Sequence, residues 1–182
     1  MAFRPSNRDM ATTSVAHRLA AVATAAWLLC TARTAAAQAY TTATIDDRGT
    51  LRVSRSAGPD LVPPREPEQL GFLTPRIAAG GRAAGWLLEF PVAGSLGRAP
   101  MKLVIYTAGR VRSFTGVGLP IWRWVFQARG RRVAFEQSAV DGGRGVHFEL
   151  RDVPSGDLID KHDPDLGIEP APAWVTTLRA AP

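Results

Sequence analysis

One strand-like stretch carries the residue types that most often perform acid–base chemistry. His147, Glu149 and Arg151 occur at alternate positions of the segment VHFELRD, so an extended chain places their side chains on one face. A histidine beside a carboxylate can act as a general base, and one hypothesis is a small envelope hydrolase using His147 and Glu149. The same alternation describes any strand with one solvated face and one buried face. We favour the solvated face and assign no catalytic residue. The residues predicted to be buried opposite it are Val146, Phe148 and Leu150.

A second group interleaves aromatic and basic side chains. Trp122, Arg123 and Trp124 are consecutive, and further arginines follow at positions 129, 131 and 132. Aromatic rings can stack on sugars or bases, and guanidinium groups can hold phosphates or carboxylates. Aromatic residues are also the usual filling of small β cores, so we favour Trp122 and Trp124 as core residues. If they point outward instead, they form the binding site. Strict alternation predicts two faces: Trp122, Trp124 and Phe126 on one, Ile121, Arg123 and Val125 on the other.

The sequence also contains an esterase-like motif. Residues 93–97 read AGSLG, but an esterase nucleophile needs its serine on a turn from a strand into a helix. Another strand pattern follows here, so we predict a plain loop at Ser95.

No metal or cofactor is predicted. Residues 163–169, DPDLGIE, contain only a fragment of a calcium-binding loop. His147 and His162 are the only histidines after the N-terminal segment, and two histidines without a cysteine do not suit a structural zinc site.

The N-terminal residues have the order of a secretory signal peptide. The mostly apolar run Leu19–Cys30 follows a basic residue and precedes small residues. It is shorter than the roughly 20 residues that span a bilayer. Cleavage after Ala37 or after Ala39 satisfies the small-residue rule equally well, and we place it after Ala39. We therefore expect an exported protein, periplasmic or secreted, with no transmembrane segment after cleavage. Cys30 is the only cysteine and leaves with the signal peptide.

Charge is unevenly distributed along the chain. The whole chain has a formal charge of +6 at pH 7, with most basic residues before position 152 and an acidic tail at 152–182. A basic body can attract an anionic envelope polymer, although a solvated surface explains the same composition. Export disfavours nucleic acid as a partner.

The elements that position these residues are predicted to be strands. Residues 40–70 read as a hairpin followed by a proline-rich connection, because proline lacks the donor that a β ladder needs. Residues 71–115 form a first sheet unit and residues 116–161 a second one. In the second unit we expect strands at Ile121–Gln127, Arg132–Gln137, Val146–Asp152 and Asp157–Lys161. An acidic tail with a short helix at Ala173–Arg179 completes the chain, and Trp174 is its expected anchor.

The two sheet units are related by an internal repeat of about 49 residues. IAAGGRAAGW, starting at Ile77, aligns with FQARGRRVAF, starting at Phe126. Four-strand units repeated at 40 to 50 residues are typical of propeller blades. The second unit, with GRRVAF (Gly130–Phe135) and FELRDVPSG (Phe148–Gly156), resembles the WD-repeat-like blades of TolB-type β-propellers. The chain also resembles exported bacterial proteins of similar length through GWLLEF, LVIY and HFELRD. The resemblance implies a scaffold and brings no catalytic residues.

We predict an all-β fold in which two propeller-blade-like meander sheets stack as a small sandwich, because two blades cannot close a ring of 4 to 8. The predicted shared core is Leu87, Phe90, Leu103, Ile105, Val133, Phe135, Phe148 and Leu150. The function predicted from these features is a non-enzymatic exported module that binds a protein or a carbohydrate or anionic envelope polymer. The alternatives are the hydrolase and a structural subunit of a larger β assembly; an oligomer is not excluded. The candidate binding residues are Trp122, Arg123, Trp124, His147, Glu149 and Arg151.

Overall fold

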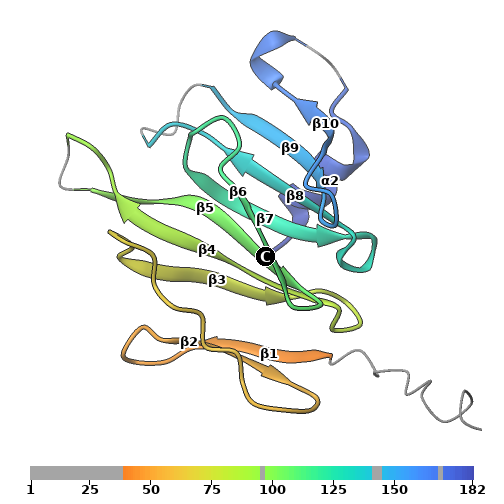
Figure 1. Cartoon of the computed structure of the whole chain (residues 1–182). Helices are drawn as coiled ribbons and strands as arrows, with labels where there is room; N and C mark the ends of the chain where they lie inside the picture. The colour runs from red at the N-terminus through yellow and green to blue at the C-terminus, as the bar shows by residue number, and fades with distance from the viewer. Residues whose placement is uncertain (1–38, 95–96, 141–144, 168–169) are drawn as a thin grey trace, which may run out of the picture. The chain divides into compact units, whose positions relative to one another are not determined.

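The structure is a computed structural model that describes residues 39–94, 97–140, 145–167 and 170–182. These residues form three antiparallel sheets and one short α-helix (Figure 1). The predicted all-β class with a short C-terminal helix is therefore confirmed. Residues 1–38 of the predicted signal peptide, which runs to Ala39, and the loop serine Ser95 lie outside the described residues.

Each sheet is built from strands that follow one another in the sequence. A hairpin of β1 (Tyr40–Ile45) and β2 (Leu51–Arg55) comes first. The first sheet contains β3 (Gly71–Ile77), β4 (Ala83–Pro91), β5 (Arg98–Thr107) and β6 (Arg110–Phe114) in that order. The second sheet contains β7 (Ile121–Gln127), β8 (Arg132–Gln137), β9 (His147–Asp152) and β10 (Leu158–His162), again in order. Two 3-10 turns, Ala128–Gly130 and Pro164–Leu166, and the helix α2 (Ala173–Ala180) complete the described chain.

The two four-stranded sheets bury their facing sides against each other. Leu87, Leu103 and Ile105 of the first sheet pack against Val133 and Phe135 of the second, and all five are buried. Side chains alternate between the two faces of a strand, so each sheet contributes every second residue to this core. These five positions of the predicted core are confirmed.

Three predicted core positions were assigned to the wrong layer. Phe90 packs with the hairpin, on the opposite face of the first sheet. Phe148 and Leu150 lie on the outer face of the second sheet, where α2 covers them. The pairing of β9 with β8 determines this face. Leu150 is opposite Ala134, which lies on the outer face, and not opposite a residue of the inter-sheet core.

The β1–β2 hairpin forms a third layer on the outer face of the first sheet. Its buried residues Tyr40, Leu51 and Val53 cover Trp86 and Leu88 of β4. Figure 1 shows the hairpin, the first sheet and the second sheet in succession. As a result β4 is buried on both faces over most of its length. The proline-rich connection that follows the hairpin contains no helix or strand, as predicted, and Leu61 pairs with Val53 through a single bridge.

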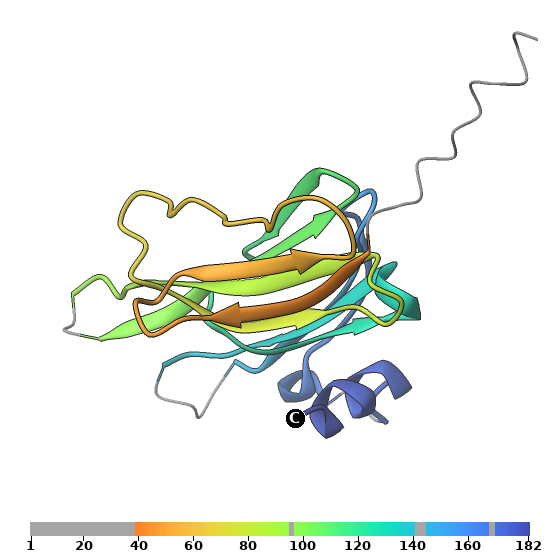
Figure 2. The same cartoon turned by 90° about the horizontal axis from the view of Figure 1, so that it is seen from below.

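The helix α2 lies on the remaining face of the second sheet (Figure 2). Val175 and Leu178 are its fully buried residues, spaced to share one helix face. Trp174, the predicted anchor, is only half-buried, and its indole Nε1 donates to Asp160 Oδ2 at 2.8 Å. The helix prediction is confirmed, but its main apolar contacts come from the two aliphatic residues.

One buried amide organises the connection between the two four-stranded sheets. Gln137 is fully buried, and its side chain accepts from the Val117 amide and donates to the carbonyls of Thr115 and Leu119. Gly116 lies against the same amide, with a φ of 53°, and an added Cβ would meet Gln137 Oε1 at 1.8 Å. Polar groups buried in a loop need such partners, so Gln137 supports the crossover.

We expect Gln137→Leu to lower the free energy of unfolding by about 2–4 kcal/mol, because three backbone groups lose their partner while the apolar volume is kept. Chemical denaturation followed by tryptophan fluorescence measures this change. Gln127→Leu is the matched control, since Gln127 makes one hydrogen bond, to the Trp174 carbonyl, and we expect a loss of about 1 kcal/mol or less. Equal losses in the two variants would contradict this role.

Candidate functional site

A β-bulge in β7 separates the two neighbouring tryptophans. The register between β7 and β8 shifts between Ile121 and Arg123, so Ile121 and Trp124 both face the inter-sheet core. Trp122 is 39% exposed, whereas Trp124 is 2% exposed. The predicted faces were therefore wrong at Ile121 and Trp122, because a bulge adds a residue and breaks strict alternation. Of the two indoles, one is core and one is surface.

Trp124 connects the two sheets. Its indole Nε1 donates to Thr74 Oγ1 of β3 at 3.1 Å. Its ring lies against Gly85 of β4, where an added Cβ would come within 2.7 Å of the ring. Arg76 stacks over the ring, with Cζ 5.9 Å from the centroid, a distance at which a cation is attracted to an aromatic face.

The strand β3, which contributes Thr74, also contains a bulge. The register between β3 and β4 shifts between Leu73 and Arg76, and Thr74 has a φ of 43°. A non-glycine residue in this region costs about 1–3 kcal/mol and persists where the surroundings hold it. Here the hydrogen bond from Trp124 holds the Thr74 side chain. The two bulges therefore bring β3 and β7 together around one indole.

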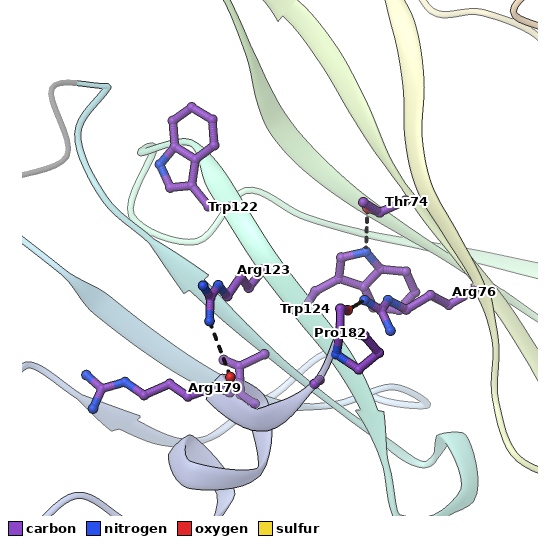
Figure 3. Close-up of a pocket in the computed structure, with 9 residues that line it drawn as sticks. Thr74, Arg76, Trp122, Arg123, Trp124, Arg179 and Pro182 are labelled. Carbon is purple, nitrogen blue, oxygen red and sulfur yellow. Dashed lines mark hydrogen bonds between the residues drawn. The ribbon is translucent and has the colours of Figure 1, made fainter.

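A cleft of about 480 Å³ opens at this position (Figure 3). We call it the arginine cleft, because three of its lining residues are arginines and none is acidic. It lies between β3, β7 and the end of α2. Its lining residues are Thr74, Arg76, Trp122, Arg123, Trp124, Leu178, Arg179, Ala181 and Pro182.

The arginines of the cleft keep most of their hydrogen-bonding capacity. Arg76 Nη2 donates to the Pro182 carbonyl, and its buried Nε has no hydrogen-bond partner among the described residues. Arg123 Nη1 donates to the Arg179 carbonyl at 3.3 Å. A guanidinium group has five N–H donors, so each has several left. Arg179 lies at the rim, where its own guanidinium stacks on Phe148 and points away from the other two in Figure 3.

No Asp or Glu side chain pairs with these arginines within the described part of the chain. The ion pairs there involve other residues, and none includes Arg76, Arg123 or Arg179. Glu136 is opposite Arg123 in the β7–β8 register, but the two side chains form no ion pair within 4 Å. The electrostatic potential of the cleft is therefore positive.

The second predicted group lies elsewhere and is buried. His147 is 8% exposed and Glu149 3% exposed, so the prediction of a solvated face on β9 was wrong. Glu149 is opposite Phe135 and Arg151 is opposite Val133, which places them on the same side as the inter-sheet core. Burial of charged groups requires partners, and here they have them.

These residues form a linear cluster with Asp163, which we call the His147 cluster. His147 Nδ1 contacts Asp163 Oδ1, and His147 Nε2 lies 3.1 Å from Glu149 Oε1. Arg151 Nε donates to the other oxygen of Glu149 at 2.6 Å. Each ring nitrogen of His147 thus lies against a carboxylate oxygen. This arrangement ties the loop after β10 to β9.

Two other carboxyl groups hold turns. The backbone N–H of Ser155 donates to Asp152 at 3.0 Å and holds the pKa of this carboxyl below its usual range. The Thr50 N–H does the same for the pKa of Asp46 in the β1–β2 turn. Hydrogen bonds to the charged form favour ionisation, so both carboxylates are turn caps.

Sequence reasoning brought Trp122, Arg123 and Trp124 together but missed Thr74, Arg76 and Asp163. The sequence did contain one signal for Thr74 and Arg76. Pro75 lies between them inside β3, and a proline in a strand indicates an edge or a bulge. No local pattern connects Asp163 with His147.

Comparisons with known proteins give no family assignment: no protein-family model matches the chain, and no curated protein matches it. Within the described ranges there is no group of three or more His, Cys, Asp or Glu residues placed to hold a metal ion. The described helices include none that is long and apolar enough to cross a membrane.

We expect His147→Leu to lower the free energy of unfolding by about 1–3 kcal/mol, because Glu149 and Asp163 lose a partner while side-chain volume is kept. Thermal and urea unfolding measure this loss. Lys161→Ala, on the exposed part of β10, is the control and should change stability by about 0.5 kcal/mol or less. An unchanged stability of His147→Leu would contradict a structural role for the cluster.

Proposed function

We propose that this protein is an exported, non-catalytic binding module whose arginine cleft binds an anionic polymer. The observation that carries the proposal is a cleft of about 480 Å³ with three lining arginines and no lining carboxylate. Arginine presents its donors in a planar fork that suits carboxylate and phosphate groups. A volume of this size lies within the range of ordinary ligand pockets.

Local strain supports the same choice of site. The positive φ of Thr74 and the bulges in β3 and β7 occur where the cleft forms. Bulges often redirect side chains next to functional sites, and strained residues cluster there as well. Export is proposed from the signal-peptide pattern of the first 39 residues.

The competing explanation is that these arginines only hold the end of α2. Arg76 and Arg123 each bond one backbone carbonyl near the helix end, and a cation is favourable there. One neutral hydrogen-bond donor at each of these two carbonyls would be enough to hold the end of α2. The absence of carboxylate side chains from the lining of the cleft is better explained by a ligand anion.

Our first functional test is binding of poly-glutamate, a soluble polyanion, by the purified protein. We expect Arg76→Gln with Arg123→Gln to raise the dissociation constant at least tenfold, because a hydrogen bond to a charged group is worth about 1.5–3 kcal/mol. Wild-type binding should weaken as salt is added, since screening reduces attraction between exposed charges. Isothermal titration calorimetry measures both effects.

Arg82→Gln with Arg110→Gln is the control for this test, because this double variant also removes two positive charges, from exposed positions outside the cleft. It should change the dissociation constant less than twofold. Equal weakening by the control and the cleft double variant would indicate general charge attraction and refute a specific site.

A second candidate function is assembly through the edge of the second sheet. Leu158 and Ile159 are exposed on β10, which has a neighbour on one side only. Exposed apolar edge strands can pair with other chains. The open, apolar edge is the observation that favours this role.

Light scattering of the purified protein separates these two functions. We expect a monomer, because Asp160 and Lys161 place charges on the same edge strand and charges discourage edge pairing. A defined oligomer that Ile159→Lys converts to monomers would favour assembly as the function instead.

A further inference from the structure

We propose that the polymer bound in the arginine cleft is an acidic polysaccharide, with a sugar ring on the indole of Trp122 and its carboxylate on the arginines. This inference rests on the proposed function and specifies its ligand class. The relevant chemistry is a pyranose ring that carries a carboxylate, as in a uronic acid. The argument depends on how Trp122 is held, what lies beside it and where a ligand oxygen fits.

Trp122 is an exposed aromatic surface that is fixed in place. The residue is 39% exposed and lines the cleft, while its Nε1 donates to the Ser138 carbonyl at 3.1 Å. The hydrogen bond restrains the side chain before a ligand arrives, so less conformational entropy is lost on binding. Tryptophan combines an apolar face with a polar edge, and here the polar edge is used internally. The apolar face remains for the C–H groups of a sugar ring.

The bulge lets Arg123 line the same cleft as Trp122, with the indole and the guanidinium group extending in different directions along its wall (Figure 3). Arg123 follows Trp122 directly and is also exposed. Regular alternation would put neighbouring residues on opposite faces of the strand. The bulge instead lets both line one cleft. A ligand with an apolar ring face and an attached anion satisfies both side chains, whereas a plain polyanion uses only the arginine.

The inner end of the cleft already receives one oxygen atom. The carbonyl oxygen of Pro182 accepts from Arg76 Nη2, beside the ring of Trp124 (Figure 3). A carboxylate oxygen of a ligand has the same acceptor chemistry, and Arg76 has further N–H donors for it. The contact with Pro182 thus shows that Arg76 presents its guanidinium group to an oxygen atom at this end of the cleft.

The test compares four probes by calorimetry with the full-length protein. The probes are an oligomer of galacturonic acid, poly-glutamate with the same number of carboxylates, polyphosphate of similar length, and a neutral oligomer of glucose. We expect the uronic acid oligomer to bind about tenfold more tightly than poly-glutamate, a difference in the range of one aromatic stacking contact. We expect the neutral oligomer to bind at least tenfold more weakly than the uronic acid oligomer.

Variants of Trp122 test whether this residue causes the preference for the uronic acid oligomer over poly-glutamate. Trp122→Ala should weaken binding of the uronic acid oligomer about tenfold and change poly-glutamate binding less than twofold. Trp122→Phe keeps an aromatic face and should retain most of the preference. Circular dichroism of both variants checks that the fold is intact, which is expected because the ring is partly exposed.

Each other outcome identifies which proposal fails. Equal affinity for the uronic acid oligomer and poly-glutamate would overturn the saccharide inference and leave the anion-binding function standing. Tightest binding of polyphosphate would also overturn it and identify phosphate as the anion. Binding of the neutral oligomer as tight as that of the uronic acid oligomer, or no binding of any polyanion, would overturn both.

Discussion

The contact between Trp124 and Gly85 is the constraint on which both the sheet stack and the cleft depend. The indole occupies space that a Cβ at position 85 would fill, since such an atom would lie 2.7 Å from the ring and 2.6 Å from Ile105 Cδ1. Close packing leaves little freedom to move either group. The position of β7 against β4 is therefore fixed by one missing side chain and one large one. The hydrogen bond to Thr74 then fixes the third strand, β3.

The cleft results from how this constraint is satisfied. To keep both Ile121 and Trp124 in the core, β7 needs an extra residue, and that residue is Trp122. To bring a hydroxyl to the indole N–H, β3 adopts a positive φ at Thr74 and then directs Arg76 over the ring. Both strands thus depart from regular geometry for reasons of packing, and the departures expose an indole and two guanidinium groups together. The same packing that stabilises the stack also produces the candidate binding site.

The sequence predicted the strands well and their faces less well. β7 and β8 lie where alternation and turn residues placed them, because hairpin signals are local. The face of Trp122 could not be predicted, since one inserted residue reverses every later side chain. The face of β9 depended on its register with β8, where Phe135 fixes Glu149 on the buried side. Buried charged groups are unfavourable without partners, and Asp163, the partner of His147, is 16 residues away from it, beyond any local pattern. Arg76 was missed for the same reason, because its place at the cleft depends on the pairing of distant strands.

The distribution of charge follows from the same contacts. The acidic tail that follows the basic body is largely engaged in internal bonds: Asp160 accepts from Trp174, and Asp165 from the Gly145 amide. Asp163 contacts His147, on the side of the second sheet that faces away from α2. These carboxylates are used at β9, β10 and the turn after them, and none lines the arginine cleft. The cleft therefore keeps an excess of positive side chains, because these carboxylates of the acidic tail are bonded elsewhere in the fold. Net charge would not reveal this site, since the attraction of a ligand depends on which charges remain uncompensated at the surface it meets.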